Sequence, residues 1–146
     1  MKLKLYSADF SHSLSLDYAE GGVRAGFPSP AQDYISEAID LNKELILHPA
    51  TTYYARAVGD SMVGCGIDDG DLLVIDKSLE AQDGDIVVAF LDGEFTLKIV
   101  RFDSAHQCVW LIAANEEYPP IKVTEGNNFL IWGVLTYNIK KQHGKR

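Results

Sequence analysis

Hydrophobic and polar residues alternate in different ways along the chain, and the change of pattern divides it into three stretches. From residue 52 onward the apolar residues come in short runs rich in Val, Ile, Leu, Tyr and Phe, which is typical of β-strands. Turn residues separate the runs, and Asp92-Gly93 is a dipeptide expected in a tight hairpin turn. The pattern predicts six strands: Thr52–Val58, Leu72–Asp76, Asp85–Leu91, Glu94–Phe102, Cys108–Ala113 and Phe129–Ile139.

A short stretch with helical features precedes the strands. Ser29 can cap a helix that begins at Pro30, and Gln32 completes a Ser-x-x-Gln capping box. Asp40 is placed to end this first helix and to cap a second one. The apolar residues of the stretch fall near helical spacing: Tyr34, Ile35, Ala38, Ile39 and Leu45.

The first thirty residues show neither pattern. They are rich in polar residues, and Gly26, Pro28 and Pro30 interrupt any regular structure around them. We therefore expect an extended, flexible amino-terminal arm over residues 1–29 and a folded domain over residues 30–146. The expected fold class is mainly β, with a short helical segment leading into the sheet.

Charge and composition restrict the function. The 146 residues carry 13 basic and 21 acidic side chains, a net charge of −8. Proteins that grip nucleic acid usually show a basic footprint, so direct DNA binding is not expected. The basic residues that end the chain form a short tail that we expect to be solvated. No apolar run approaches the roughly 18 residues of a membrane span.

The two cysteines give no sign of metal chemistry. Cys65 and Cys108 lack the spacing of a metal site, and Cys65 is expected to be a small loop residue of low reactivity. The four histidines are scattered along the sequence as well. We therefore expect a cytoplasmic protein that needs no metal and no cofactor and does not contact a membrane.

Two polar residues stand where chemistry is plausible. Ser61 follows a strand and a glycine that allows a sharp change of direction, although a serine after a glycine is also common in ordinary turns. Lys98 lies in a strand whose two faces are both largely apolar, so alternation predicts its partial burial. A buried lysine is favoured as the neutral amine, which beside a serine can act as a general base. The alternative is that Lys98 extends from an edge strand to water.

The segments around these residues resemble a known family. They occur in the family's order, and Ser61 and Lys98 are 37 residues apart, as that order requires. The chain is similar to the LexA/UmuD-type self-cleaving serine peptidases, family S24. The segments that carry the resemblance are Gly59–Met62, Gly66–Val74, Gly84–Val87 and Asp92–Lys98, with Ala25-Gly26 and Phe27–Pro30 upstream.

This resemblance implies a fold and a set of catalytic roles. The fold would be the LexA/signal-peptidase-like β-clip of twisted antiparallel strands. The chain would cut itself between Ala25 and Gly26, with Ser61 as the nucleophile and Lys98 as its base. The backbone N–H groups of Ser61 and Met62 would stabilise the oxyanion. Thr96, two residues before Lys98 on the same face of the strand, is a possible orienter of the amine.

The resemblance also implies partners. A protein of the UmuD type serves SOS mutagenesis: a RecA filament on single-stranded DNA stimulates self-cleavage, and the homodimeric product joins a UmuC-like Y-family translesion DNA polymerase. About twenty-four residues precede the cleavage point, which we expect to be too few for the DNA-binding domain of a LexA-type repressor. Two alternatives stay open. One is a non-enzymatic β-domain that binds a polymerase or regulator, and the other is a phage or plasmid anti-repressor peptidase of the same family.

Overall fold

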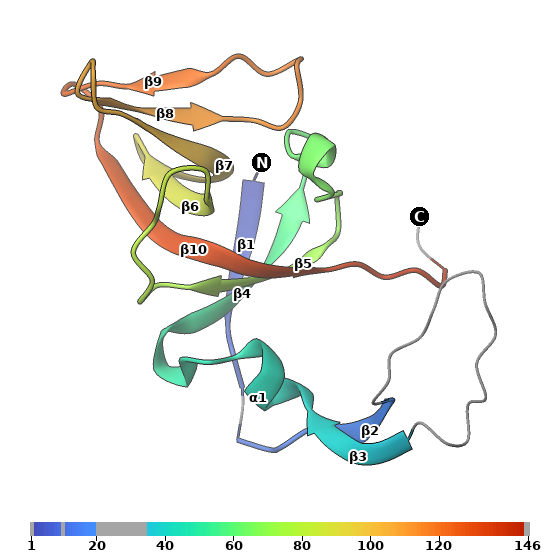
Figure 1. The fold of residues 1–146 in the computed structure, drawn as a ribbon. Helices are drawn as coiled ribbons and strands as arrows, with labels where there is room; N and C mark the ends of the chain where they lie inside the picture. Colours follow the sequence, from blue (N-terminus) through green and yellow to red (C-terminus); the bar gives the residue numbers. More distant parts are fainter. Residues whose placement is uncertain (1, 10, 20–34, 145–146) are drawn as a thin grey trace. The chain divides into compact units, whose positions relative to one another are not determined.

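The structure is a computed structural model that describes residues 2–9, 11–19 and 35–144 (Figure 1). Two compact units make up the chain. The larger unit combines Met1–Ala8 with Ala50–Arg146, and the smaller unit is Asp9–Pro49. Within the described residues, no helix is long and apolar enough to cross a membrane.

The larger unit is built on one antiparallel sheet. β10 runs between β5 and β6 in the middle of the sheet, and the sheet curls so that its edge strand β1 comes near β7 (Figure 1). The strands, in spatial order, are β1 (Lys2–Ser7), β4 (Thr52–Val58), β5 (Leu72–Asp76), β10 (Phe129–Ile139), β6 (Ile86–Leu91), β7 (Glu94–Asp103), β8 (Cys108–Ile112) and β9 (Ile121–Val123). All six predicted strands are confirmed.

The tight hairpin between β6 and β7 forms as the sequence predicts. Leu91 pairs with Glu94, which leaves a two-residue turn at Asp92 and Gly93. Both turn residues have positive φ angles, 49° at Asp92 and 91° at Gly93, as a turn that matches the twist of the strands requires. This turn fixes the register of β7 and thereby the position of Lys98 on it.

Alternation along the strands buries side chains on both faces of the sheet. In β6, for example, Val88 belongs to one apolar cluster while Val87 and Ala89 belong to the other. The first cluster contains Ala55, Ala57, Met62, Ile67, Leu73, Ile75, Val88 and Leu97. The second contains Val87, Ala89, Val100, Leu111, Val123 and Val134.

Part of the predicted amino-terminal arm is a strand of this sheet. Residues 2–7 form β1, which pairs along its whole length with β4. Leu3 and Leu5 are half-buried against the first cluster, while Lys2 and Lys4 are exposed. The alternation of apolar and polar residues in β1 spans only a few residues of a mostly polar segment. The sequence pattern therefore does not predict this strand.

The smaller unit corrects one helix prediction. β2 (Ser15–Ala19) and β3 (Ile35–Asp40) pair antiparallel, so residues 35–40 are a strand and not the first helix. Pairing with a segment twenty residues away outweighs the local helical spacing of the apolar residues. The second helix is confirmed: α1 (Leu41–Leu45) begins where the Asp40 carboxylate accepts a hydrogen bond from the Asn42 N–H at 3.0 Å. The predicted capping box at Ser29 lies outside the described residues.

Candidate active site

Ser61 lies in a tight turn directly after β4. Gly59 opens this turn with a φ of 102°, a left-handed conformation that favours glycine. Its N–H donates a 2.8 Å hydrogen bond to the Asp69 carboxylate, which ties the turn to the loop before β5. Ser61 itself exposes 2% of its surface. The sequence therefore folds the serine into the interior instead of leaving it on a surface turn.

Side-chain burial and backbone hydrogen bonds hold the loop after Ser61 in place. The Met62 side chain is fully buried in the first cluster, and its carbonyl accepts hydrogen bonds from the N–H groups of Cys65 and Ile67. The Gly64 N–H donates to the Ala114 carbonyl at 2.7 Å. A Cβ atom at Gly64 would lie 2.5 Å from that carbonyl oxygen, so only glycine fits this approach. The neighbouring Ser61 is thus carried on a closely packed loop.

Lys98 is buried on an internal strand. Its surface is 6% exposed, and it lies opposite Val87 of β6. This burial shows that the alternative of a lysine that reaches water from an edge strand is wrong. The predicted burial of Lys98 is confirmed.

The Lys98 amine contacts three oxygen atoms. Its Nζ lies 3.5 Å from Ser61 Oγ, 3.0 Å from Thr96 Oγ1 and 3.3 Å from the Leu97 carbonyl oxygen. A neutral amine has two N–H bonds and one lone pair. If the Thr96 hydroxyl and the Leu97 carbonyl accept the two N–H bonds, the lone pair is free to face the Ser61 hydroxyl. The structure therefore brings together Ser61, Lys98 and Thr96, whereas Ala25 and Gly26 lie outside the described residues.

Residues that sequence analysis missed hold the other side of the Ser61 turn. Tyr118 Oη donates a 2.5 Å hydrogen bond to the Asp60 carboxylate, and Asn115 Nδ2 donates to the Asp60 carbonyl at 3.0 Å. The hydrogen bond to Asp60 raises the pKa of Tyr118 above its ordinary value. A pocket of about 330 Å³ is lined by Ser61, Asp60 and Tyr118 among others. Because more than fifty residues separate the partners, no local pattern signals these contacts.

The surroundings of Cys65 disfavour its thiol as a nucleophile. Its thiol donates a hydrogen bond to the Met62 carbonyl at 3.2 Å, and burial raises the pKa of the Cys65 thiol above its ordinary value. A raised pKa leaves less thiolate, which is the reactive form. These features support the prediction of an unreactive loop cysteine.

Comparison with known proteins assigns the chain to a family. Residues 18–136 match the Peptidase S24-like family, a stretch that contains Ser61 and Lys98. The chain belongs to this family. It is 44% identical to Protein SamA of Salmonella typhimurium over 117 residues, which cover 80% of this chain and 79% of SamA. It is 37% identical to Protein MucA of Escherichia coli over 141 residues, 95% of this chain and 94% of MucA.

A LexA repressor is also related to this S24 chain. The LexA repressor of Ectopseudomonas mendocina is 46% identical over 122 residues, which cover 83% of this chain and 58% of the repressor. Together with the UmuD-like relatives, this match confirms the resemblance to the LexA/UmuD type and to SOS mutagenesis proteins. The mainly antiparallel, curled sheet confirms the expected β-clip fold class.

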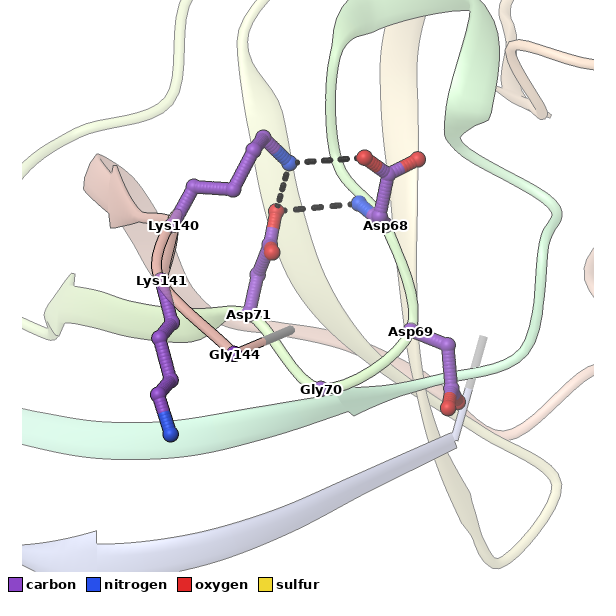
Figure 2. A pocket seen from close by; sticks show the side chains of 7 residues that line it. All are labelled: Asp68, Asp69, Gly70, Asp71, Lys140, Lys141 and Gly144. Carbon is purple, nitrogen blue, oxygen red and sulfur yellow. Dashed lines mark hydrogen bonds and ion pairs between the residues drawn. The ribbon is translucent and has the colours of Figure 1, made fainter. Parts of the chain in front are cut away.

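In this S24 chain, an ion-pair cluster fastens the end of β10 to the loop that follows Ser61. Lys140 Nζ donates to the Asp68 carboxylate at 2.9 Å and to Asp71 Oδ2, and Figure 2 shows both contacts with Lys141 pointing away from them. The Asp68 N–H and the Asn138 side-chain amide also donate to Asp71 Oδ2, at 2.9 and 3.3 Å. We call Asp68, Asp71, Asn138 and Lys140 the tail clamp. Lys140 is thus bound to the loop and is not part of a solvated tail.

The tail clamp perturbs both of its main charged groups. Burial raises the pKa of Asp71, but the hydrogen bonds from Lys140, Asp68 and Asn138 outweigh it, so the pKa lies below the ordinary value. The hydrogen bonds to Asp71 and Asp68 raise the pKa of Lys140. Asn138 Nδ2 donates to the Gly66 carbonyl as well, at 3.1 Å. The end of the sheet therefore restrains the loop that carries Ser61 and Met62.

Proposed function

We propose that this protein is a self-cleaving serine peptidase that cuts its own chain between Ala25 and Gly26, with Ser61 as the nucleophile and Lys98 as the general base. The observation that carries the proposal is the 3.5 Å approach of Lys98 Nζ to Ser61 Oγ, made by two residues that are each less than a tenth exposed. Membership of the Peptidase S24-like family supports the same chemistry. Burying a lysine side chain otherwise costs free energy, because its polar amine loses contact with water.

The proposed reaction proceeds in two steps. Neutral Lys98 takes the proton from Ser61 Oγ as the oxygen attacks the Ala25 carbonyl, and the N–H groups of Ser61 and Met62 stabilise the oxyanion. The Lys98 ammonium then gives that proton to the nitrogen of Gly26 as the peptide bond breaks. In the second step Lys98 accepts a proton from a water molecule as its oxygen attacks the Ala25 ester, and the Lys98 ammonium then gives that proton to Ser61 Oγ as the ester bond breaks. Thr96 keeps the amine oriented through its 3.0 Å hydrogen bond.

The proposed setting is SOS mutagenesis in the bacterial cytoplasm. A RecA filament on single-stranded DNA stimulates the cleavage. The product, residues 26–146, acts as a homodimer and joins a UmuC-like Y-family DNA polymerase as its accessory subunit. Support comes from the UmuD-like relatives and from exposed apolar side chains on β10, at Leu130, Tyr137 and Ile139, which a second copy could cover. In this proposal the RecA filament and the polymerase contact DNA, and this protein does not bind DNA directly.

Self-cleavage can be followed directly. The purified protein is incubated over a pH series without RecA, and mass spectrometry measures the loss of residues 1–25. If Lys98 is the general base, cleavage is expected to depend on its amine as well as on the Ser61 hydroxyl. Ser61→Ala is expected to abolish cleavage, and Lys98→Ala is expected to lower its rate by about 100-fold or more. Thr96→Val is expected to lower it by about two- to tenfold, with Thr96→Ser restoring it.

Matched controls use exposed residues of the same types. Ser104→Ala and Lys122→Ala change side chains that the structure leaves on the surface, so cleavage by these variants is expected to match the wild type. Cleavage that survives Lys98→Ala at the wild-type rate would contradict the proposed base. A wild-type chain that stays intact even with RecA, ATP and single-stranded DNA would favour the non-enzymatic binding domain. A UmuC-like gene beside this one separates the UmuD-type role from an anti-repressor.

A further inference from the structure

The position of β1 determines what self-cleavage uncovers. β1 is the edge strand next to β4, and its covalent path to β4 runs through residues 8–51, which contain the bond between Ala25 and Gly26. We propose that the free side of β4 is a docking site for an extended segment of a partner protein, covered by β1 until cleavage. The partner segment carries aliphatic side chains at alternate positions and an acidic residue between them. This inference rests on the cleavage proposed above.

The contacts that β1 makes with β4 show which side chains form the apolar part of the docking site. Leu3 pairs with Ala57 and Leu5 pairs with Ala55. The two alanines are almost fully buried, at 1% and 0% exposure, and both leucines pack against the cluster that contains them. Large side chains on β1 thus cover small ones on β4. An occupant therefore needs aliphatic side chains two residues apart.

The charges across the two strands fit poorly with β1 itself. Lys4 pairs with Arg56, and both side chains are exposed. Like charges directly opposite each other destabilise an antiparallel pair. Arg56 also donates a hydrogen bond to the Gly70 carbonyl at 3.1 Å, which holds the guanidinium beside the edge. A segment with an acidic residue in the place of Lys4 would pair with Arg56 and fit the site better than β1 does.

Cleavage changes how firmly β1 is held. While the chain is intact, the linker keeps β1 at an effective concentration that reaches about the millimolar range for flexible tethers. After cleavage residues 1–25 are held only by non-covalent contacts: the pairing of β1 with β4, the packing of two leucines and the pairing of β2 with β3. Without the covalent linker, these contacts compete with a partner segment at the concentration of the protein itself. The departure of β1 leaves the N–H and C=O groups of β4 unpaired, which is the template for strand addition.

The test separates the docking site from the peptidase chemistry. In the full-length Ser61→Ala protein, the residues around Ala25-Gly26 are replaced by the recognition sequence of a site-specific protease, which then nicks the chain. Amide hydrogen exchange over Thr52–Val58 is expected to rise after nicking. A labelled peptide with the sequence of residues 1–9 and its Lys4→Glu form are then added. Fluorescence anisotropy is expected to show that the glutamate peptide binds about five- to tenfold more tightly.

Two controls sharpen the result. A peptide of residues 1–9 that carries Leu3→Ser and Leu5→Ser is expected not to bind. Arg56→Glu in the nicked protein is expected to reverse the preference between the unchanged peptide and its Lys4→Glu form. If the nicked protein keeps residues 1–24 through gel filtration with β4 still protected, or if the preference does not depend on residue 56, the docking site is refuted. Failure of the wild type to cleave itself contradicts only the proposed peptidase, because the nick does not use Ser61.

Discussion

Asp71 shows how a single buried carboxylate can be stabilised by its surroundings. It is 4% exposed, and its Oδ2 atom accepts hydrogen bonds from a lysine, an amide side chain and a backbone N–H. Removing a partner from such a group costs more than the net value of one hydrogen bond, because the remaining polar atoms stay buried without compensation. The sequence contains Asp71 in a turn signal, but only the fold places Lys140 against it.

Asp71→Asn is expected to destabilise the protein by about 1–3 kcal/mol at neutral pH. The pKa of Asp71 is lowered in the folded state, so its contribution is present above the unfolded value near 3.8 and is lost as the pH falls through the lower folded value. The pKa of Lys140 is raised, so its contribution is lost only as the pH rises above 10.5. Urea unfolding at pH 7 and at pH 3 measures how much of the Asp71 contribution is lost in acid.

The exposed partner supplies the control for this prediction. Asp68→Asn changes a carboxylate whose side chain is 54% exposed and which shares Lys140 with Asp71, so its effect on the free energy of unfolding is expected to be clearly smaller. Equal effects of the two substitutions, or a difference between wild type and Asp71→Asn that persists unchanged at acid pH, would contradict this account of the tail clamp.

Among the secondary-structure elements, the sequence predicts best those that depend on local pattern. The six predicted strands are runs rich in apolar residues, and the Asp92-Gly93 turn and the Asp40 cap depend on neighbouring residues only. β1, β2, β3 and β9 are short or polar, and they form because other strands pair with them. The burial of Lys98 follows from alternation, but the approach of Tyr118 to Asp60 depends on how the loop after β8 closes over the Ser61 turn.

The packing of that loop gives a prediction of its own. Gly64→Ala places a Cβ against the Ala114 carbonyl oxygen, so the loop that carries Ser61 must shift, at a cost of about 1–3 kcal/mol in stability. Self-cleavage is expected to slow in the same variant. Gly126→Ala is the matched control, because a Cβ there meets only Thr124 Oγ1 at 3.9 Å. Thermal unfolding and the cleavage assay report the two effects, and a neutral Gly64→Ala would show that the contact does not hold the loop.

At the scale of the whole molecule, the proposed cleavage would leave the net charge unchanged. Residues 1–25 hold three basic and three acidic side chains, so residues 26–146 keep ten basic and eighteen acidic ones and the full net charge of −8. The proposed cleavage would therefore remove a segment with no net charge. It would change the exposed surface and leave the net charge unchanged.

The cleaved product is accordingly expected not to bind nucleic acid by itself. A body with this charge repels a phosphate backbone, and screening by salt weakens the repulsion without replacing it by attraction. Fluorescence anisotropy with a labelled single-stranded oligonucleotide at 0.1 M salt is expected to show no binding at micromolar protein. Salt-sensitive binding in that range would reveal a basic surface that the net charge conceals.

The burial of Ser61 and Lys98 also determines which inhibitors can reach the site and which proteins can enter it as substrates. With 2% and 6% of their surfaces exposed, neither residue is open to a bulky reagent that diffuses in from solution. Broad serine-directed electrophiles are therefore poor probes of this site, whereas small warheads attached to an extended peptide suit it better. If Ser61 is the nucleophile proposed above, the same inaccessibility would protect the folded proteins of the cell, because only an extended strand brought into the site could reach it.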